Sequence, residues 1–140
     1  MEFKYPVRLE EAKEGGFVVT CRDLPDAITQ GEDAEDAIEN AEGAIQASIE
    51  FRIEKKMDIP NPSKARKNEV VVAVPILTAM KAALYLSTRG LRGACAKIAL
   101  ALNVDEKEAR RILDPKHATK ASTIERALSA LGHKAILSFE

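Results

Sequence analysis

The spacing of the apolar residues changes along this chain, and that change limits the folds open to it. Between Phe3 and Leu9, apolar residues occupy every second position, which is the period of a strand with one buried face. After residue 75 they recur at helical spacing instead. The sequence therefore predicts an α+β fold, with strands in the N-terminal half and helices throughout the C-terminal half.

Two further strands are predicted before the first helix. Gly15-Gly16 permits a tight reversal into an apolar strand at residues 17–21. The Pro and Asp content of residues 23–26 predicts a turn, and residues 27–31 are long enough for a short edge strand.

A long helix is predicted to begin after Asp33, whose carboxylate can accept hydrogen bonds from the free N–H groups of the first turn. Its apolar residues recur at helical spacing and are expected to pack on the sheet. This stripe consists of Ala34, Ile38, Ala41, Ile45 and Ile49.

A chain of 140 residues can form one compact domain or two small ones, and the region of residues 58–68 favours two. That region holds two prolines and little apolar content, so it is interpreted as a connector. Residues 69–74, EVVVAV, follow as a strand that returns to the first sheet and completes a βββαβ domain over residues 1–74. Residues 75–140 form the second domain, with Pro75 at the start of its first helix.

The formal net charge of −1 conceals an uneven distribution. Residues 1–63 contain fifteen Asp or Glu against seven Lys or Arg, whereas residues 64–140 contain fourteen basic residues against seven acidic ones. Such a split favours two domains with different partners. On charge alone, two solvated surfaces that serve solubility are an equally good interpretation.

The first helix of the second half is predicted to be amphipathic and to end at Gly90, a residue suited to a left-handed cap. Its stripe consists of Ile76, Leu77, Met80, Ala83 and Leu84. A second short helix is predicted over residues 94–102, with an apolar face formed by Ile98, Ala99 and Leu102.

The next stretch has the pattern of a helix-turn-helix motif. Asn103 tolerates the left-handed conformation of a tight turn, and Val104 can fill the angle between the two helices. Asp105 and Glu108 form an acidic variant of the capping box at the start of the second helix. The positions expected to face the partner helix or the core are Ala99, Ala109 and Ile112.

The second helix of such a motif enters the DNA major groove, where Arg can make bidentate contacts with guanine and Lys can contact phosphate. A basic loop after Asp114-Pro115 can lie along a phosphate backbone. The candidate DNA-binding residues are Lys107, Arg110, Arg111, Lys116, His117 and Lys120. A plain helical hairpin with solvated basic residues is the alternative, and a lone histidine is more often a surface residue than a ligand.

Two elements are predicted after this loop. Ser122 and Glu125 match a capping box for a last helix that ends at Gly132. The apolar residues of this helix are Ile124, Leu128 and Leu131. Residues 134–139, KAILSF, are interpreted as a terminal strand whose open edge can pair across a twofold axis to form a dimer.

The sequence also argues against several classes of protein. It has no run of about 18 apolar residues and no features of a secretory signal, so the protein is expected to be cytoplasmic. Cys21 and Cys95 are far apart and are interpreted as buried apolar residues, not as a disulfide or metal ligands. No Ser/His/Asp set, glycine-rich phosphate loop or metal cluster supports an enzyme, and no cofactor is expected.

Nearly the whole chain is similar to one known family. The similarity rests on the N-terminal run YPVRLEEAKEGGFVVTCRDLPDAITQGEDAEDAIENAEGAI and on the C-terminal run ALNVDEKEARRILDPKHATK, followed by ALSALGHKA. With these runs the chain resembles the HicB antitoxins of bacterial and archaeal toxin–antitoxin pairs, in the subfamily with a C-terminal helix-turn-helix domain. Asn103 stands where the family more usually has Gly, and Gly93-Ala94 is a weak start for the first helix of the motif.

The resemblance implies two partners. HicB proteins bind HicA, a small ribonuclease toxin with a double-stranded-RNA-binding-like fold, and keep it from cleaving messenger RNA. They also repress their own operon by binding operator DNA, usually as dimers or larger assemblies. The acidic N-terminal half can cover the positive surface of such a nuclease, with Asp23 and Asp26 as candidate toxin-binding residues.

The N-terminal fold of the family resembles a partial ribonuclease H fold, which raises the question of nuclease activity. That chemistry needs several carboxylates converging on metal ions, including one from the middle of the first strand. Residues 3–9 contain no carboxylate, and Asp23 and Asp26 lie in a turn, so no nuclease activity is expected. The alternative function is a stand-alone transcription regulator whose N-terminal domain senses a small molecule, although the Ala/Ile stripe suits packing better than a pocket.

Overall fold

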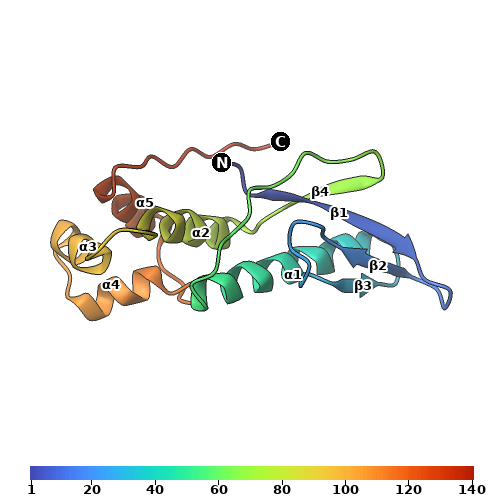
Figure 1. The fold of residues 1–140 in the computed structure, drawn as a ribbon, viewed down its shortest axis with the longest axis horizontal. Coiled ribbons are helices and arrows are strands. Elements are labelled where there is room, and N and C mark those ends of the chain that lie inside the picture. Colours follow the sequence, from blue (N-terminus) through green and yellow to red (C-terminus); the bar gives the residue numbers. More distant parts are fainter. The chain divides into compact units, whose positions relative to one another are not determined.

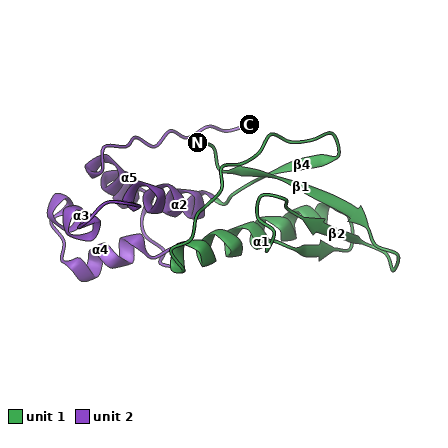
Figure 2. Ribbon diagram, in the orientation of Figure 1, with its two compact units in different colours: residues 1–75 green, residues 76–140 purple.

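The computed structural model describes all 140 residues and divides into two compact units, residues 1–75 and residues 76–140 (Figures 1 and 2). The first unit contains β1 (Lys4–Glu11), β2 (Phe17–Thr20), β3 (Thr29–Gly31), α1 (Ala34–Glu54) and β4 (Glu69–Ala73). The second contains α2 (Ile76–Thr88), α3 (Ala94–Leu102), α4 (Glu106–Leu113) and α5 (Ala121–Ala130). The predicted α+β class and the βββαβ order of the first unit are confirmed.

The four strands form one antiparallel sheet in the order β3-β2-β1-β4. The register places Leu9 opposite Val19 and Tyr5 opposite Val72, so apolar residues two apart along each strand share the face that packs against α1. Tyr5 is fully buried there, and its hydroxyl donates a 2.7 Å hydrogen bond to the carbonyl oxygen of Pro60 in the connector.

Helix α1 begins as predicted, because the Asp33 carboxylate accepts a 2.8 Å hydrogen bond from the Asp36 N–H. The expected apolar stripe is wrong at its N-terminal end, where Ala34 is exposed and Ile38 is only half-buried. Ala37 is buried in place of Ala34. Because both residues are alanines, the apolar pattern did not show which of them faces the sheet. The buried residues of α1 are Ala37, Ala41, Ile45, Ser48, Ile49 and Ile53.

Three glycines fix the path of the chain around the sheet. Gly15 and Gly16 have φ angles of +96° and +75°, which confirms the tight reversal predicted between β1 and β2. Gly31 lies where β3 passes the first turn of α1, and a Cβ at this position would collide with the backbone of Ala37. Sheet and helix therefore approach more closely here than any side chain would permit.

The core of the second unit is formed by all four helices. The predicted face of α2 is confirmed at Leu84, which is buried, and at Met80 and Ala83, which pack against the core, but it is wrong at the start of the helix. Ile76 is 62% exposed and Leu77 is 36% exposed, whereas the side chain of Lys81 is buried. Apolar residues surround most of α2, so their spacing alone does not select a face. The buried hydrophobic cluster consists of Leu84, Ile98, Ala99, Leu102, Ala109, Ile112, Ile124, Ala127 and Leu128.

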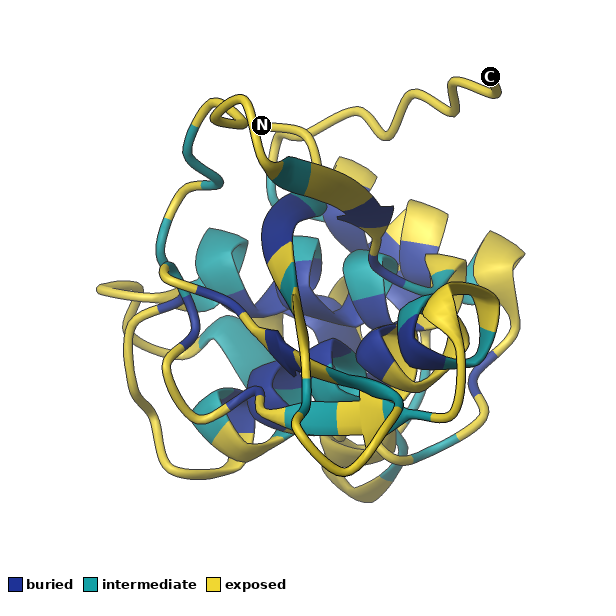
Figure 3. Cartoon of the chain, turned by 90° about the vertical axis from the view of Figure 1, so that its right-hand side faces the viewer, coloured by how far each residue is buried: buried dark blue, intermediate teal, exposed yellow.

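The end of the chain departs from two predictions. Helix α5 starts at Ala121 after Lys120, with no side-chain cap, so Ser122 and Glu125 lie within its first turns and do not form the predicted capping box. The strand predicted at residues 134–139 is also absent, because no neighbouring strand pairs with this segment. Its side chains are exposed, including Phe139 at 95% (Figure 3).

The two cysteines are both free, as predicted, but only Cys21 is buried. Cys95 is half-buried at the start of α3, where its Sγ lies 3.6 Å from the carbonyl oxygen of Glu106. None of the helices combines the length and the apolar content needed to span a membrane.

Candidate functional surfaces

Helices α3 and α4 are joined by a tight turn in the second unit. Asn103 adopts the left-handed conformation at φ +54°, and the Val104 N–H donates a 3.0 Å hydrogen bond to the Ala99 carbonyl oxygen. The Asp105 carboxylate then accepts a 2.8 Å hydrogen bond from the Glu108 N–H, which starts α4. The turn is therefore built by the residues that the sequence indicated.

Helix α4 directs its three basic side chains to solvent, since Lys107, Arg110 and Arg111 are all exposed. Arg110 lies 3.8 Å from the carboxylate of Glu106, and Arg111 lies 3.2 Å from that of Glu108. Exposed pairs of this kind are weak and can open without much loss of free energy. The basic side chains can therefore turn to an anionic partner, although Glu106 and Glu108 on the same helix compete for them.

The loop between α4 and α5 adds further basic groups. Lys116 and Lys120 are exposed, and Lys120 directly precedes the first residue of α5. His117 is half-buried, with its Nδ1 atom 2.8 Å from the hydroxyl of Thr119. All six candidate DNA-binding residues thus lie between positions 107 and 120 of the same unit, and five of them are exposed.

Lys81 is a residue of this region that the sequence reading missed. Its ammonium group is buried and donates to the carbonyl oxygens of Arg111 at 3.2 Å and Ile112 at 2.7 Å, and to the hydroxyl of Thr119 at 2.8 Å. Burial lowers the pKa of Lys81 to about 8, against the opposing effect of the Asp114 charge. The available signal was a single lysine within the apolar run ILTAMKAALYL.

The two candidate toxin-binding aspartates lie in the turn after β2, and each carboxylate holds that turn to another part of the first unit. Asp23 accepts from the N–H and hydroxyl of Ser63, at 2.8 and 2.6 Å. Asp26 accepts from the hydroxyl of Ser48 at 3.0 Å and from Arg52 at 2.7 Å. Partial burial raises the pKa of Asp26, but the bonds from Arg52 and Ser48 outweigh it and lower that pKa overall.

The exposed side of α1 carries a second group of carboxylates. Glu35, Glu39 and Glu42 are all exposed along its N-terminal half. These three carboxylates are therefore displayed by one regular element.

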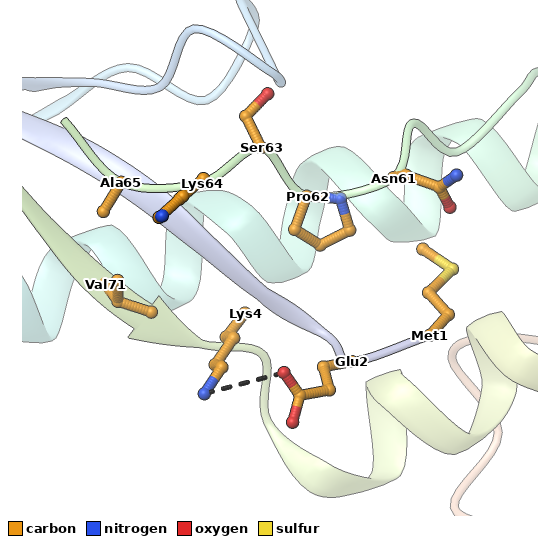
Figure 4. Close-up of a pocket in the computed structure, with 9 residues that line it drawn as sticks. All are labelled: Met1, Glu2, Lys4, Asn61, Pro62, Ser63, Lys64, Ala65 and Val71. Atoms are coloured by element: carbon orange, nitrogen blue, oxygen red, sulfur yellow. Dashed lines mark ion pairs between the residues drawn. The ribbon is translucent and has the colours of Figure 1, made fainter.

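An open groove of about 660 Å³ runs between the connector and strands β1 and β4 (Figure 4). Its lining includes Lys4, Pro62, Ser63, Lys64 and Val71. The Lys4 ammonium lies 3.8 Å from the carboxylate of Glu2 at its margin. Most of these side chains are short or face water, so the groove lacks the convergent polar groups of a small-molecule site.

The sequence of this chain is similar to those of known antitoxins. The family model of HicB-like antitoxins of bacterial toxin–antitoxin systems matches residues 4–83. The antitoxin HicB 1 of Photorhabdus laumondii is 35% identical over 98% of this chain and 87% of its own length, and the antitoxin HicB of Escherichia coli K12 is 33% identical over 92% and 94%. The chain belongs to the HicB-like antitoxin family, and membership implies a toxin as partner.

Proposed function

We propose that this antitoxin inhibits a HicA-type messenger RNA ribonuclease with its first unit and represses its own operon by binding operator DNA with its second. The observation that carries the DNA-binding half of the proposal is the pair α3 and α4, joined at Asn103, with Lys107, Arg110 and Arg111 exposed on the second helix. This arrangement fits a helix-turn-helix whose second helix enters the major groove.

The toxin-binding part of the proposal rests on charge complementarity. A nuclease that holds RNA presents positive surface, and the exposed carboxylates of Glu35, Glu39 and Glu42 on α1 offer a complementary one. The carboxylate of Asp26 binds Ser48 and Arg52 of α1, whereas that of Asp23 binds Ser63 of the connector, so both are engaged within the unit. Both are proposed as residues that shape the toxin-binding face and not as its main contacts.

Coexpression with the cognate toxin tests the proposed toxin inhibition. A fragment of residues 1–74 is expected to restore growth, and continued toxicity despite a folded, soluble fragment would contradict the assignment. In the full chain, Glu39→Lys combined with Glu42→Lys should weaken toxin binding strongly. Glu14→Lys, at the exposed β1–β2 turn, is the control for a charge reversal away from α1.

Operator binding is tested by fluorescence anisotropy with the full chain on promoter DNA and on random DNA of equal length. Binding specific for the promoter supports the proposal, and equal affinity for both DNAs contradicts it. A stand-alone regulator that senses a small molecule gains no support from the groove of the first unit, since that groove is open and poor in convergent polar groups.

A homodimer or larger homo-oligomer is the proposed assembly. The C-terminal segment exposes Ile136 at 85%, Leu137 at 75% and Phe139 at 95%, and pairing with a second copy would cover them. Deletion of residues 134–140 should shift the protein toward monomer in light scattering. An unchanged mass would place the interface elsewhere.

A further inference from the structure

The ammonium group of Lys81 connects α2 to both ends of the loop that follows α4. Two of its three hydrogen bonds go to carbonyl oxygens in the last turn of α4, and the third goes to Thr119 at the end of the loop. The carbonyls at a helix C-terminus have no partners within the helix and carry partial negative charge, so a cation suits them. One atom therefore joins the last turn of α4 to Thr119, two residues before the start of α5.

Packing does not explain a lysine at this position. The side chain is 1% exposed, and removing an ammonium from water is unfavourable unless hydrogen bonds replace those to water. A methionine or leucine would fill similar space at the core without that cost. All three donors of the ammonium are used here, which matches a role in fixing the groups it contacts.

The segment held in this way contains most of the proposed DNA contacts. Arg110 and Arg111 lie in the last turn of α4, and Lys120 directly follows Thr119. The Thr119 hydroxyl accepts from Lys81 and lies 2.8 Å from Nδ1 of His117, to which it can donate. This contact links the imidazole of His117 to the same hydroxyl that Lys81 holds.

We propose that Lys81 is a positioning residue for DNA binding, which holds the end of α4 and residues 114–120 in the conformation that contacts DNA without touching DNA itself. This inference rests on the proposed DNA-binding function. Without the ammonium, the loop is free to sample other conformations, and the basic side chains lose their fixed spacing relative to the phosphates.

The first test compares Lys81→Met with two controls in operator-binding assays on the full chain. Lys81→Met is expected to weaken operator binding by roughly tenfold, the scale of one lost contact. The two controls should keep the wild-type affinity for the operator. Ile98→Val removes one methyl group from the same core at α3, and Lys13→Met removes one positive charge in the first unit. Wild-type affinity of Lys81→Met would overturn the inference.

The second test separates positioning from a general loss of structure. In a double-mutant cycle, Lys81→Met and Lys120→Ala should be less than additive on DNA, because the first change already displaces the second residue. Additive effects would contradict the positioning role of Lys81.

The hydroxyl that Lys81 contacts offers a further test. Thr119→Ser should retain the affinity for the operator and Thr119→Val should lose it. Equal affinities of these two variants would also contradict the inference. If Lys120→Ala and Arg110→Ala both bind as the wild type does, the proposed DNA-binding function itself fails.

Discussion

Arg22 and Glu69 form a two-point ion pair between the segment that follows β2 and the start of β4, with nitrogen–oxygen distances of 2.8 and 3.0 Å. The same guanidinium donates a 2.6 Å hydrogen bond to the carbonyl oxygen of Lys64. The connector and the returning strand are therefore fixed to the sheet by one side chain, although β1 lies between β2 and β4.

This pair predicts a loss of stability in acid. The hydrogen bonds from Arg22, and then that from the Arg66 N–H, lower the pKa of Glu69 to about 2 from its usual 4.5. Its contribution to the free energy of unfolding is therefore present above pH 4.5 and is lost as the pH falls toward 2. Glu69→Gln should flatten this dependence, measured by urea denaturation followed through amide signals of β1 and β4. Glu14→Gln, an exposed control, should leave the dependence unchanged.

Alanine substitutions at Gly31 and Gly43 of the first unit should have opposite effects on its stability. Gly31→Ala places a Cβ against the backbone of Ala37 and should destabilise the unit by about 1–3 kcal/mol. Gly43→Ala meets nothing within 4 Å inside α1 and should stabilise it by up to about 1 kcal/mol. Thermal and urea unfolding would check both, and a neutral Gly31→Ala would mean that β3 and α1 can separate without loss.

Lys81 predicts a rise of stability with pH in the alkaline range for the second unit. Its pKa is about 8 in the folded protein against 10.5 for a free lysine, because burial disfavours the charge. The unfolded chain thus binds more protons between these values, and the free energy of unfolding should rise as the pH increases from about 8 to 10.5. Lys81→Met should lack this rise. Urea midpoints of the second unit at several alkaline pH values would decide the matter.

The parts of the fold that the sequence predicted well are those determined by neighbouring residues. Asp33, Asn103 and Asp105 each act on backbone groups within a few positions, so their roles follow from residue type and spacing. The alternation in β1 likewise specifies which face packs on α1, because successive side chains of a strand point to opposite sides.

The parts that were predicted wrongly depend on distant residues. The burial of Lys81 on α2 depends on acceptors on α4 and at Thr119, 31 and 38 positions away along the chain. Ser122 and Glu125 match a capping box, yet α5 already begins at Ala121. The terminal segment needs a partner strand that one chain does not supply. The assignments of DNA-binding and toxin-binding residues remain proposals.

The last prediction separates base reading from simple charge within the proposed DNA-binding unit. If α4 lies in the major groove, Arg110→Ala or Arg111→Ala should reduce the binding free energy for the operator by roughly 1–3 kcal/mol and relax the preference at one base pair. Lys116→Ala or Lys120→Ala should instead weaken operator and random DNA alike and lower the salt slope by about one unit.

Fluorescence anisotropy on both DNAs across a salt series measures these differences. Because all four side chains are exposed, their loss should leave the core intact, and the toxin should bind each variant as it binds the wild type. Toxin binding is therefore the internal control for folding. If both Arg variants bind the operator with wild-type affinity, α4 is not the helix that reads the bases.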